Sequence, residues 1–219
     1  MTAPTIPTFK LRRGRVTSTQ ASALARMWPR LGVTVDGSQL DLPARFGRCA
    51  PVVLEVGFGM GEATWQMAAA APERDLLAVD VHTPGIGSLL KLIEAHRLTN
   101  VRVADGDAVQ LLRDMLAADT LSEVRIFFPD PWPKTRHTKR RLVTTAFCDL
   151  VGTRLWPGGL LHVATDSRAY ADRVRGLLTR HDAFALIAGE DVPPRPTTRF
   201  EQQAHDAGRR SYDVAARRV

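Results

Sequence analysis

The feature that most restricts the fold of this chain is an alternation, from Pro51 onward, between short apolar runs and longer amphipathic segments. The apolar runs are rich in leucine and β-branched residues, as in parallel strands that are buried on both faces. The intervening segments repeat apolar residues at three- and four-residue spacing, which is the helical period. We therefore expect strands at 52–56, 76–81, 101–103, 124–128 and 159–165, and helices at 61–71, 86–97, 108–118, 139–154 and 167–180.

Right-handed crossovers between these strands predict a doubly wound α/β sheet with helices on both faces. After FALIA (184–188) and a proline-rich linker, the alternation in SYDVAARRV predicts a final edge strand. The first 48 residues differ in texture, because a basic stretch with Lys10, Arg12, Arg13 and Arg15 precedes an Ala-rich segment near 19–28. We expect residues 1–48 to form a basic arm and a packing helix, and residues 49–219 to form the main domain.

Charge favours a polyanionic partner. Thirty Lys and Arg against 23 Asp and Glu give a net charge of +7 and a pI near 10.2, so nucleic acid is the first candidate, although a high pI also serves solubility alone. Two cysteines, Cys49 and Cys148, indicate neither a disulfide framework nor a zinc site. The sequence has no secretory signal and no apolar run of about 18 residues. We expect a cytoplasmic chain without metal or membrane contact.

A glycine-rich turn follows the first predicted strand. In EVGFGMGEAT, Gly57, Gly59 and Gly61 stand between a buried strand and a helix, where glycine lets the backbone approach a ligand closely. The spacing is G-x-G-x-G, and its third glycine comes one residue earlier than in the dinucleotide pattern G-x-G-x-x-G. The turn therefore indicates a nucleotide-like ligand and disfavours a nicotinamide oxidoreductase.

Carboxylates accompany the ends of three successive predicted strands. Glu55 precedes the glycines, Asp80 ends the second strand, where an acid often holds ribose hydroxyls, and Asp107 follows the third. Each also has a purely structural interpretation: Glu55 as a brace, Asp80 as an ordinary strand-end residue, and Asp107 as the N-cap of a helix starting at Ala108. Their shared position favours a nucleoside site.

The stretch FFPDPWPKTRHTKRR (127–141) joins an apolar strand end to a cationic segment. Prolines on both sides of Asp130 restrict its backbone, at the sheet edge where open α/β folds bind ligands. The cations that follow could contact a phosphate backbone, with Asp130 reading or reacting. The structural alternatives are a proline-rich plug and a solvated helix face.

Six ordered blocks carry a resemblance over nearly the whole chain: EVGFGMGEAT, DVHTPGIG, DGDAV, FFPDPWPKTRHTKRRLV, ATDSRAYA and TRFEQQAHDAG. The sequence resembles the bacterial tRNA (guanine-N7-)-methyltransferases. That resemblance implies the mostly parallel, seven-stranded sheet of class I methyltransferases, S-adenosylmethionine as cofactor, and transfer of its methyl group to a guanine in the tRNA variable loop. A monomer and a homodimer both remain open.

The resemblance also implies roles for particular residues. Those implied for the cofactor are Glu55, Gly57, Gly59, Gly61, Asp80, Asp107 and Asp130, and Asp130 is also the implied catalytic residue. Those implied for tRNA are Lys134, Arg136, His137, Thr138, Lys139, Arg140, Arg141, Asp166, Thr198, Arg199, Phe200 and Glu201. The chain departs from the family pattern in having Asp at 80 and Arg at 199, where Glu and Lys are usual.

Some alternatives remain open at this level. Asp166 could cap the next helix, and Phe200 could anchor the core. Because guanine N7 carries a lone pair and no proton, methylation needs no general base, and we expect Asp130 or Glu201 to accept hydrogen bonds from guanine N1 and N2. A non-catalytic RNA-binding protein on the same fold is the main rival hypothesis.

Overall fold

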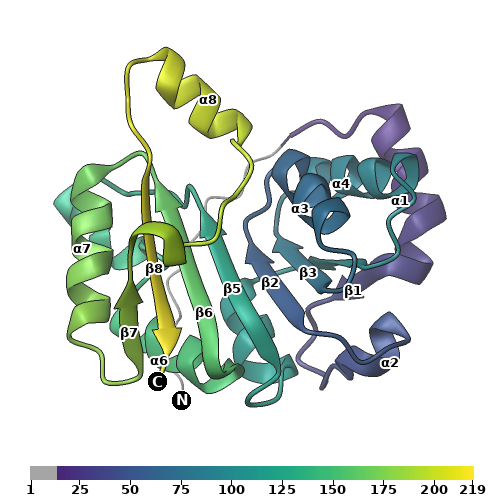
Figure 1. Ribbon diagram of the computed structural model, residues 1–219. Coiled ribbons are helices and arrows are strands. Elements are labelled where there is room, and N and C mark those ends of the chain that lie inside the picture. Colours follow the sequence, from purple (N-terminus) through teal and green to yellow (C-terminus); the bar gives the residue numbers. More distant parts are fainter. Residues whose placement is uncertain (1–13) are drawn as a thin grey trace.

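A single eight-stranded sheet organises the molecule, as shown by a computed structural model that describes residues 14–219 (Figure 1). The strand order is β1-β4-β3-β2-β5-β6-β8-β7. The first six strands pair in parallel, and β8 pairs antiparallel with β6 and with β7. The strands are β1 (Gly32–Thr34), β2 (Val52–Val56), β3 (Asp75–Asp80), β4 (Val101–Asp105), β5 (Leu121–Phe127), β6 (Leu155–Thr165), β7 (Phe184–Ile187) and β8 (Tyr212–Arg218).

Helices cover both faces, so the doubly wound, mostly parallel α/β architecture is confirmed. They are α1 (Ser18–Leu31), α2 (Leu42–Phe46), α3 (Glu62–Ala70), α4 (Thr83–Ala95), α5 (Ala108–Gln110), the π-helix η1 (Leu111–Met115), the 3₁₀ helix η2 (Thr135–Arg140), α6 (Thr145–Arg154), α7 (Arg168–Thr179), the 3₁₀ helix η3 (Gly189–Asp191) and α8 (Arg199–Asp206). Residues of α1, α3 and α4 form one apolar cluster with the sheet, and residues of α5, η1, α6 and α7 form another. No helix within residues 14–219 is long and apolar enough to cross a membrane.

Two features of the sheet differ from the sequence-based prediction. The count is eight strands rather than seven, because Gly32–Thr34 pairs with β4 at the far edge; with three residues it is too short to show a strand pattern. The C-terminal strand β8 was expected at an edge, but it lies between β6 and β7. The four-residue β7 forms the edge instead. The alternation of residues within one strand does not show which strand will pair with it, so the sequence could not predict this order.

The helical segment expected at 139–154 is divided in two. Residues 135–140 form η2, whereas α6 begins at Thr145, after Thr144 accepts a hydrogen bond from Phe147 N at 3.2 Å as its N-cap. The separation places the cationic segment on η2, a short 3₁₀ helix that follows β5, and not on α6. The basic residues Lys10, Arg12 and Arg13 of the predicted arm lie outside the described residues.

Pairing of β2 with β5 positions the two turns that the sequence singled out. Val56 lies opposite Ile126, close to the carboxyl end of each strand. Because the strands are parallel and adjacent, the glycine turn after β2 and the Pro129–Pro131 turn after β5 leave the sheet at the same edge. The two turns are therefore neighbours at one edge of the sheet.

Candidate functional site

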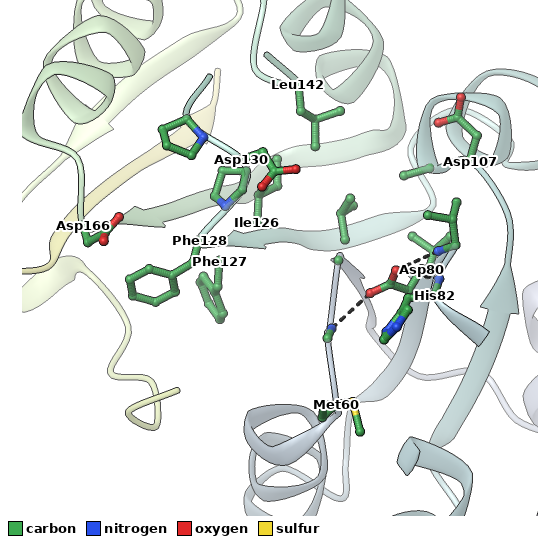
Figure 2. A pocket seen from close by; sticks show the side chains of 18 of the residues that line it. Met60, Asp80, His82, Asp107, Ile126, Phe127, Phe128, Asp130, Leu142 and Asp166 are labelled. Atoms are coloured by element: carbon green, nitrogen blue, oxygen red, sulfur yellow. Dashed lines mark hydrogen bonds between the residues drawn. The ribbon is translucent and has the colours of Figure 1, made fainter. Parts of the chain in front are cut away.

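A crevice of about 470 Å³ opens at the carboxyl edge of the sheet (Figure 2). Its walls come from the turns after β2, β3, β4, β5 and β6, and from α8 and the residues after it. The chemically distinctive lining residues are Gly57, Gly59, Met60, Asp80, His82, Asp107, Phe127, Phe128, Asp130, Asp166, Gln203 and Arg209. The structure thus gathers four of the predicted acids in one cavity.

The glycine turn has a backbone that other residues rarely adopt. Gly57, Gly59 and Gly61 have φ angles of 77°, 60° and 83°, in the left-handed region. A Cβ atom added at Gly57 would have no heavy atom within 4 Å among its non-neighbours. The turn therefore leaves open space beside the backbone at this point of the crevice wall.

Asp80 ties the glycine turn to β3. Its Oδ2 accepts a hydrogen bond from Gly59 N at 3.0 Å, and its Oδ1 accepts from Val81 N at 2.7 Å and His82 N at 3.0 Å (Figure 2). Burial raises the pKa of Asp80 above its usual value, although these three donors oppose the shift. A carboxylate has about four acceptor positions, so roughly one remains for a ligand.

The first turn of α4 packs directly against the glycine turn. A Cβ atom on Gly85 would lie 2.1 Å from the carbonyl oxygen of Gly59, closer than any real contact. Further along, a Cβ on Gly61 would lie 2.9 Å from Leu89. The shape of the crevice wall therefore depends on the absence of a side chain at Gly85.

Glu55 is buried in β2, with 3% of its surface exposed, and does not line the crevice. Its Oε2 atom is buried without a hydrogen-bond partner. Burial raises the pKa of Glu55 to about 7, against the opposing charge of Arg125. The structure thus holds an acid that is only partly ionised near neutral pH, two residues before Gly57.

Asp107 both caps a helix and faces the crevice. Its side chain accepts a hydrogen bond from Val109 N at 2.9 Å as the N-cap of α5, and it also lines the cavity. The structural interpretation of Asp107 is therefore correct, and it does not exclude a ligand contact.

The Pro129–Pro131 turn is held between two strained residues. Phe128 and Trp132 have φ angles of 53° and 41°, which bulky side chains rarely adopt and which cost on the order of 1 kcal/mol or more each. The turn presents Asp130 to the crevice (Figure 2). Such strain persists only where surrounding contacts fix the backbone.

Two of the cations expected to contact tRNA, Arg140 and Arg141, instead contact residues of this turn. Arg141 Nε donates to the carbonyl of Pro131 at 2.8 Å, and the Arg140 guanidinium lies 4.4 Å from the centre of the Trp132 ring. By contrast, Lys134, Arg136 and Lys139 are exposed. His137 meets the Trp132 ring edge-on at 5.7 Å, and Thr138 is half-buried. The cationic segment therefore divides into residues that support the turn and residues that face solvent.

The other residues predicted to bind substrate, Asp166 and residues 198–201, differ in whether they line the crevice. Asp166 lines the crevice and pairs with Arg209, while Ser167 is the N-cap of α7, so the capping interpretation of Asp166 is not met. Thr198 and Glu201 form a capping box at the start of α8, and Glu201 is buried against Arg195 at 2.9 Å, outside the crevice lining. Arg199 and Phe200 begin α8.

Sequence reasoning missed several lining residues. Gln203 and Arg209 come from α8 and the turn after it, and Phe128 comes from the strained turn. The basic pair at 209–210 directly after the TRFEQQAHDAG block was the available signal. No local pattern signals the contact between Arg209 and Asp166, because 43 residues separate them.

Comparison with known proteins gives a consistent result. Residues 49–214 match a family model described as a putative methyltransferase. The tRNA (guanine-N(7)-)-methyltransferase of Streptomyces avermitilis is 53% identical over 98% of this chain and 76% of its own, and that of Halorhodospira halophila is 47% identical over 96% and 94%. The solved structure of the 16S rRNA methyltransferase KamB covers 83% of this chain and 95% of its own, with a TM-score of 0.59 at 15% identity, and shows the fold alone.

The raised pKa of Glu55 predicts a dependence of stability on pH. The unfolded carboxyl titrates near 4.5 and the folded one near 7, so its contribution is complete below pH 4.5 and is lost as pH rises through 7. Glu55→Gln removes the titrating carboxyl and therefore the loss of stability at high pH. In urea unfolding, its stability relative to the parent should rise by on the order of 2 kcal/mol between pH 5 and pH 8. Glu73→Gln, at an exposed position, is the control, and an equal rise in both variants would contradict the assignment.

Proposed function

The chain belongs to the tRNA (guanine-N(7)-)-methyltransferase family, and from that premise we propose how its crevice moves a methyl group from S-adenosylmethionine to N7 of a guanine in the tRNA variable loop. The observation that supports this site is the shared cavity: the glycine turn and the Pro129–Pro131 turn line the same crevice. A tRNA substrate also favours the cytoplasm as the place of action.

The residues present fit S-adenosylmethionine. Open space beside Gly57 leaves room for a ligand against the backbone, and the buried Glu55 Oε2 lacks a hydrogen-bond partner. We assign Asp80 to a ribose hydroxyl, because one acceptor position remains on it, and Asp107 to the adenine side. When bound, the cofactor supplies an electrophilic methyl group on a sulfonium.

The reaction requires orientation more than proton transfer. N7 of guanine has an in-plane lone pair, so the protein has to hold the base in line, exclude water and stabilise the positive charge that develops on the purine. Of the two acids considered for that role, Asp130 lines the crevice, whereas Glu201 lies outside the crevice lining. We therefore assign Asp130 to the N1 and N2 donors of guanine.

We assign the contacts with the phosphate backbone of tRNA to the exposed cations. Lys134, Arg136 and Lys139 stand on or next to η2, which follows the Pro129–Pro131 turn. We therefore assign them contacts with phosphates on either side of a base inserted into the crevice. Extracting a base from a folded tRNA costs a few kcal/mol, which such contacts can offset.

The function is tested by methyl transfer with position mapping. The purified chain is incubated with isotopically labelled S-adenosylmethionine and unmodified tRNA, and the product is reduced and cleaved with aniline. Label should enter the RNA, and cleavage should fall at a variable-loop guanine. RNA that binds without incorporating label would support the non-catalytic alternative, and label at another position would contradict the assigned target.

The Asp130→Asn variant provides the matched comparison in the same assay. It keeps the size of the side chain but removes the charge, so single-turnover transfer should slow by roughly tenfold to a thousandfold, while tRNA affinity stays nearly intact. An unchanged single-turnover rate would remove Asp130 from the chemical step.

Salt dependence distinguishes the two groups of cations. Replacing Arg136 and Lys139 with Ala should flatten the plot of log affinity for tRNA against log salt by about 0.7 to 0.9 per lost phosphate contact. Arg175→Ala, at an exposed position of α7 outside the crevice lining, is the control and should leave the slope unchanged. If the double variant keeps the parent slope, these side chains do not contact phosphates.

The close packing of Gly85 against Gly59 predicts that a substitution at Gly85, outside the crevice lining, weakens cofactor binding. Gly85→Ala places a methyl group against the Gly59 carbonyl, whereas Gly87→Ala, on the same helix, meets Gln20 of α1 at 2.8 Å. Calorimetric titration with S-adenosylhomocysteine should show roughly tenfold or greater loss of affinity for Gly85→Ala. Gly87→Ala should bind like the parent, and equal losses in both would contradict this role for Gly85.

A further inference from the structure

Phe127 and Phe128 are adjacent in sequence, yet both rings contact the same side chain. The Arg195 guanidinium lies 5.4 Å from the centre of the Phe127 ring and 5.3 Å from that of Phe128. In a regular strand, successive side chains point to opposite faces. The φ angle of 53° at Phe128 interrupts this alternation at the end of β5, and the two rings lie close together in Figure 2.

Arg195 is held against these rings by hydrogen bonds to two carboxylates. Its Nη2 donates to Glu201 Oε1 at 2.9 Å, and its Nε donates to Asp213 Oδ1 at 2.8 Å. Only 8% of the Arg195 side chain is exposed. Two carboxylates therefore surround one guanidinium, so the group that supports the rings carries no excess positive charge.

The two rings differ in what they offer a ligand. Both rings line the crevice, but Phe127 is buried, whereas Phe128 is half-buried and therefore presents more of its surface to the cavity. Phe128 is thus the more exposed of two crevice-lining rings that the Arg195 guanidinium contacts.

We propose that Phe128 is the stacking surface for the guanine that accepts the methyl group, and that Arg195 is a positioning residue that fixes this ring. The proposal rests on the proposed function and names a contact within that site. A base removed from the RNA stack loses its neighbours, and aromatic side chains replace such contacts in single-stranded recognition.

Stacking also fits the geometry that the reaction requires. A guanine held by its face leaves both edges free: N1 and N2 on one edge for Asp130, two residues along the chain, and N7 on the other for the methyl group. The face of an aromatic ring is electronegative and attracts positive charge. Phe128 would therefore bind the purine more strongly as it becomes cationic, which lowers the barrier.

The test compares Phe128→Leu with Phe128→Tyr in single-turnover methyl transfer at saturating cofactor. Leu fills similar space without an aromatic face, so the rate should fall about 5- to 150-fold, which corresponds to the usual range for base stacking. Tyr should restore the rate to within about threefold of the parent. The affinity for S-adenosylhomocysteine should change less than about threefold in both variants, because other residues make that contact.

Each other outcome overturns the proposal. A Leu variant as fast as the parent removes stacking, and a Tyr variant as slow as Leu shows that only the shape of Phe matters. Loss of S-adenosylhomocysteine affinity in step with the rate would assign Phe128 to the cofactor side. These results presuppose a parent chain that methylates N7, and failure of that parent activity would instead overturn the proposed function.

The positioning role of Arg195 needs a separate measurement. Arg195→Lys retains a charge between Glu201 and Asp213 but loses the flat guanidinium over the rings. Its single-turnover rate should fall several-fold. In the double variant with Phe128→Leu, the fall in rate should be smaller than the product of the two single falls, since both substitutions act through one ring. Fully multiplicative effects would show that Arg195 acts independently of Phe128.

Discussion

Parallel pairing between β2 and β5 is the constraint on which the site depends. It sets Val56 opposite Ile126, so the segments that leave these strands emerge at one edge and line one cavity. On the proposed function, the glycine turn then holds the nucleoside of the cofactor while the Pro129–Pro131 turn faces the base to be modified. An antiparallel arrangement of the same two strands would put the two turns at opposite ends of the sheet, and no local rearrangement could join them.

Many charged groups of the site are engaged in holding the backbone that they adjoin. Asp80 binds the glycine turn, Asp107 caps α5, and Arg141 holds the carbonyl of Pro131. Since these contacts fix the crevice walls before any ligand arrives, little ordering entropy remains to be lost on binding. Functional and structural interpretations of such residues are therefore compatible, and substitutions at them should combine effects on shape with effects on contact.

The sequence predicts the elements with strong local signals and misses those set by distant contacts. Buried strands, the glycine turn and the acids at strand ends follow from residue pattern and spacing. The pairing of Gly32–Thr34 with β4, and the position of β8 inside the sheet, depend on partners far along the chain. Similarly, nothing local shows that Arg195 engages Glu201, or that Phe128 adopts a positive φ angle and turns toward the crevice.

The shared crevice is tested most directly by the crystal structure of the chain with S-adenosylhomocysteine. We expect the adenosine to lie between Asp80 and Asp107, with the sulfur atom directed toward the opening beside Asp130 and Phe128. A ligand bound elsewhere, or one whose sulfur points away from the Pro129–Pro131 turn, would contradict the claim that one edge of the sheet serves both cofactor and RNA.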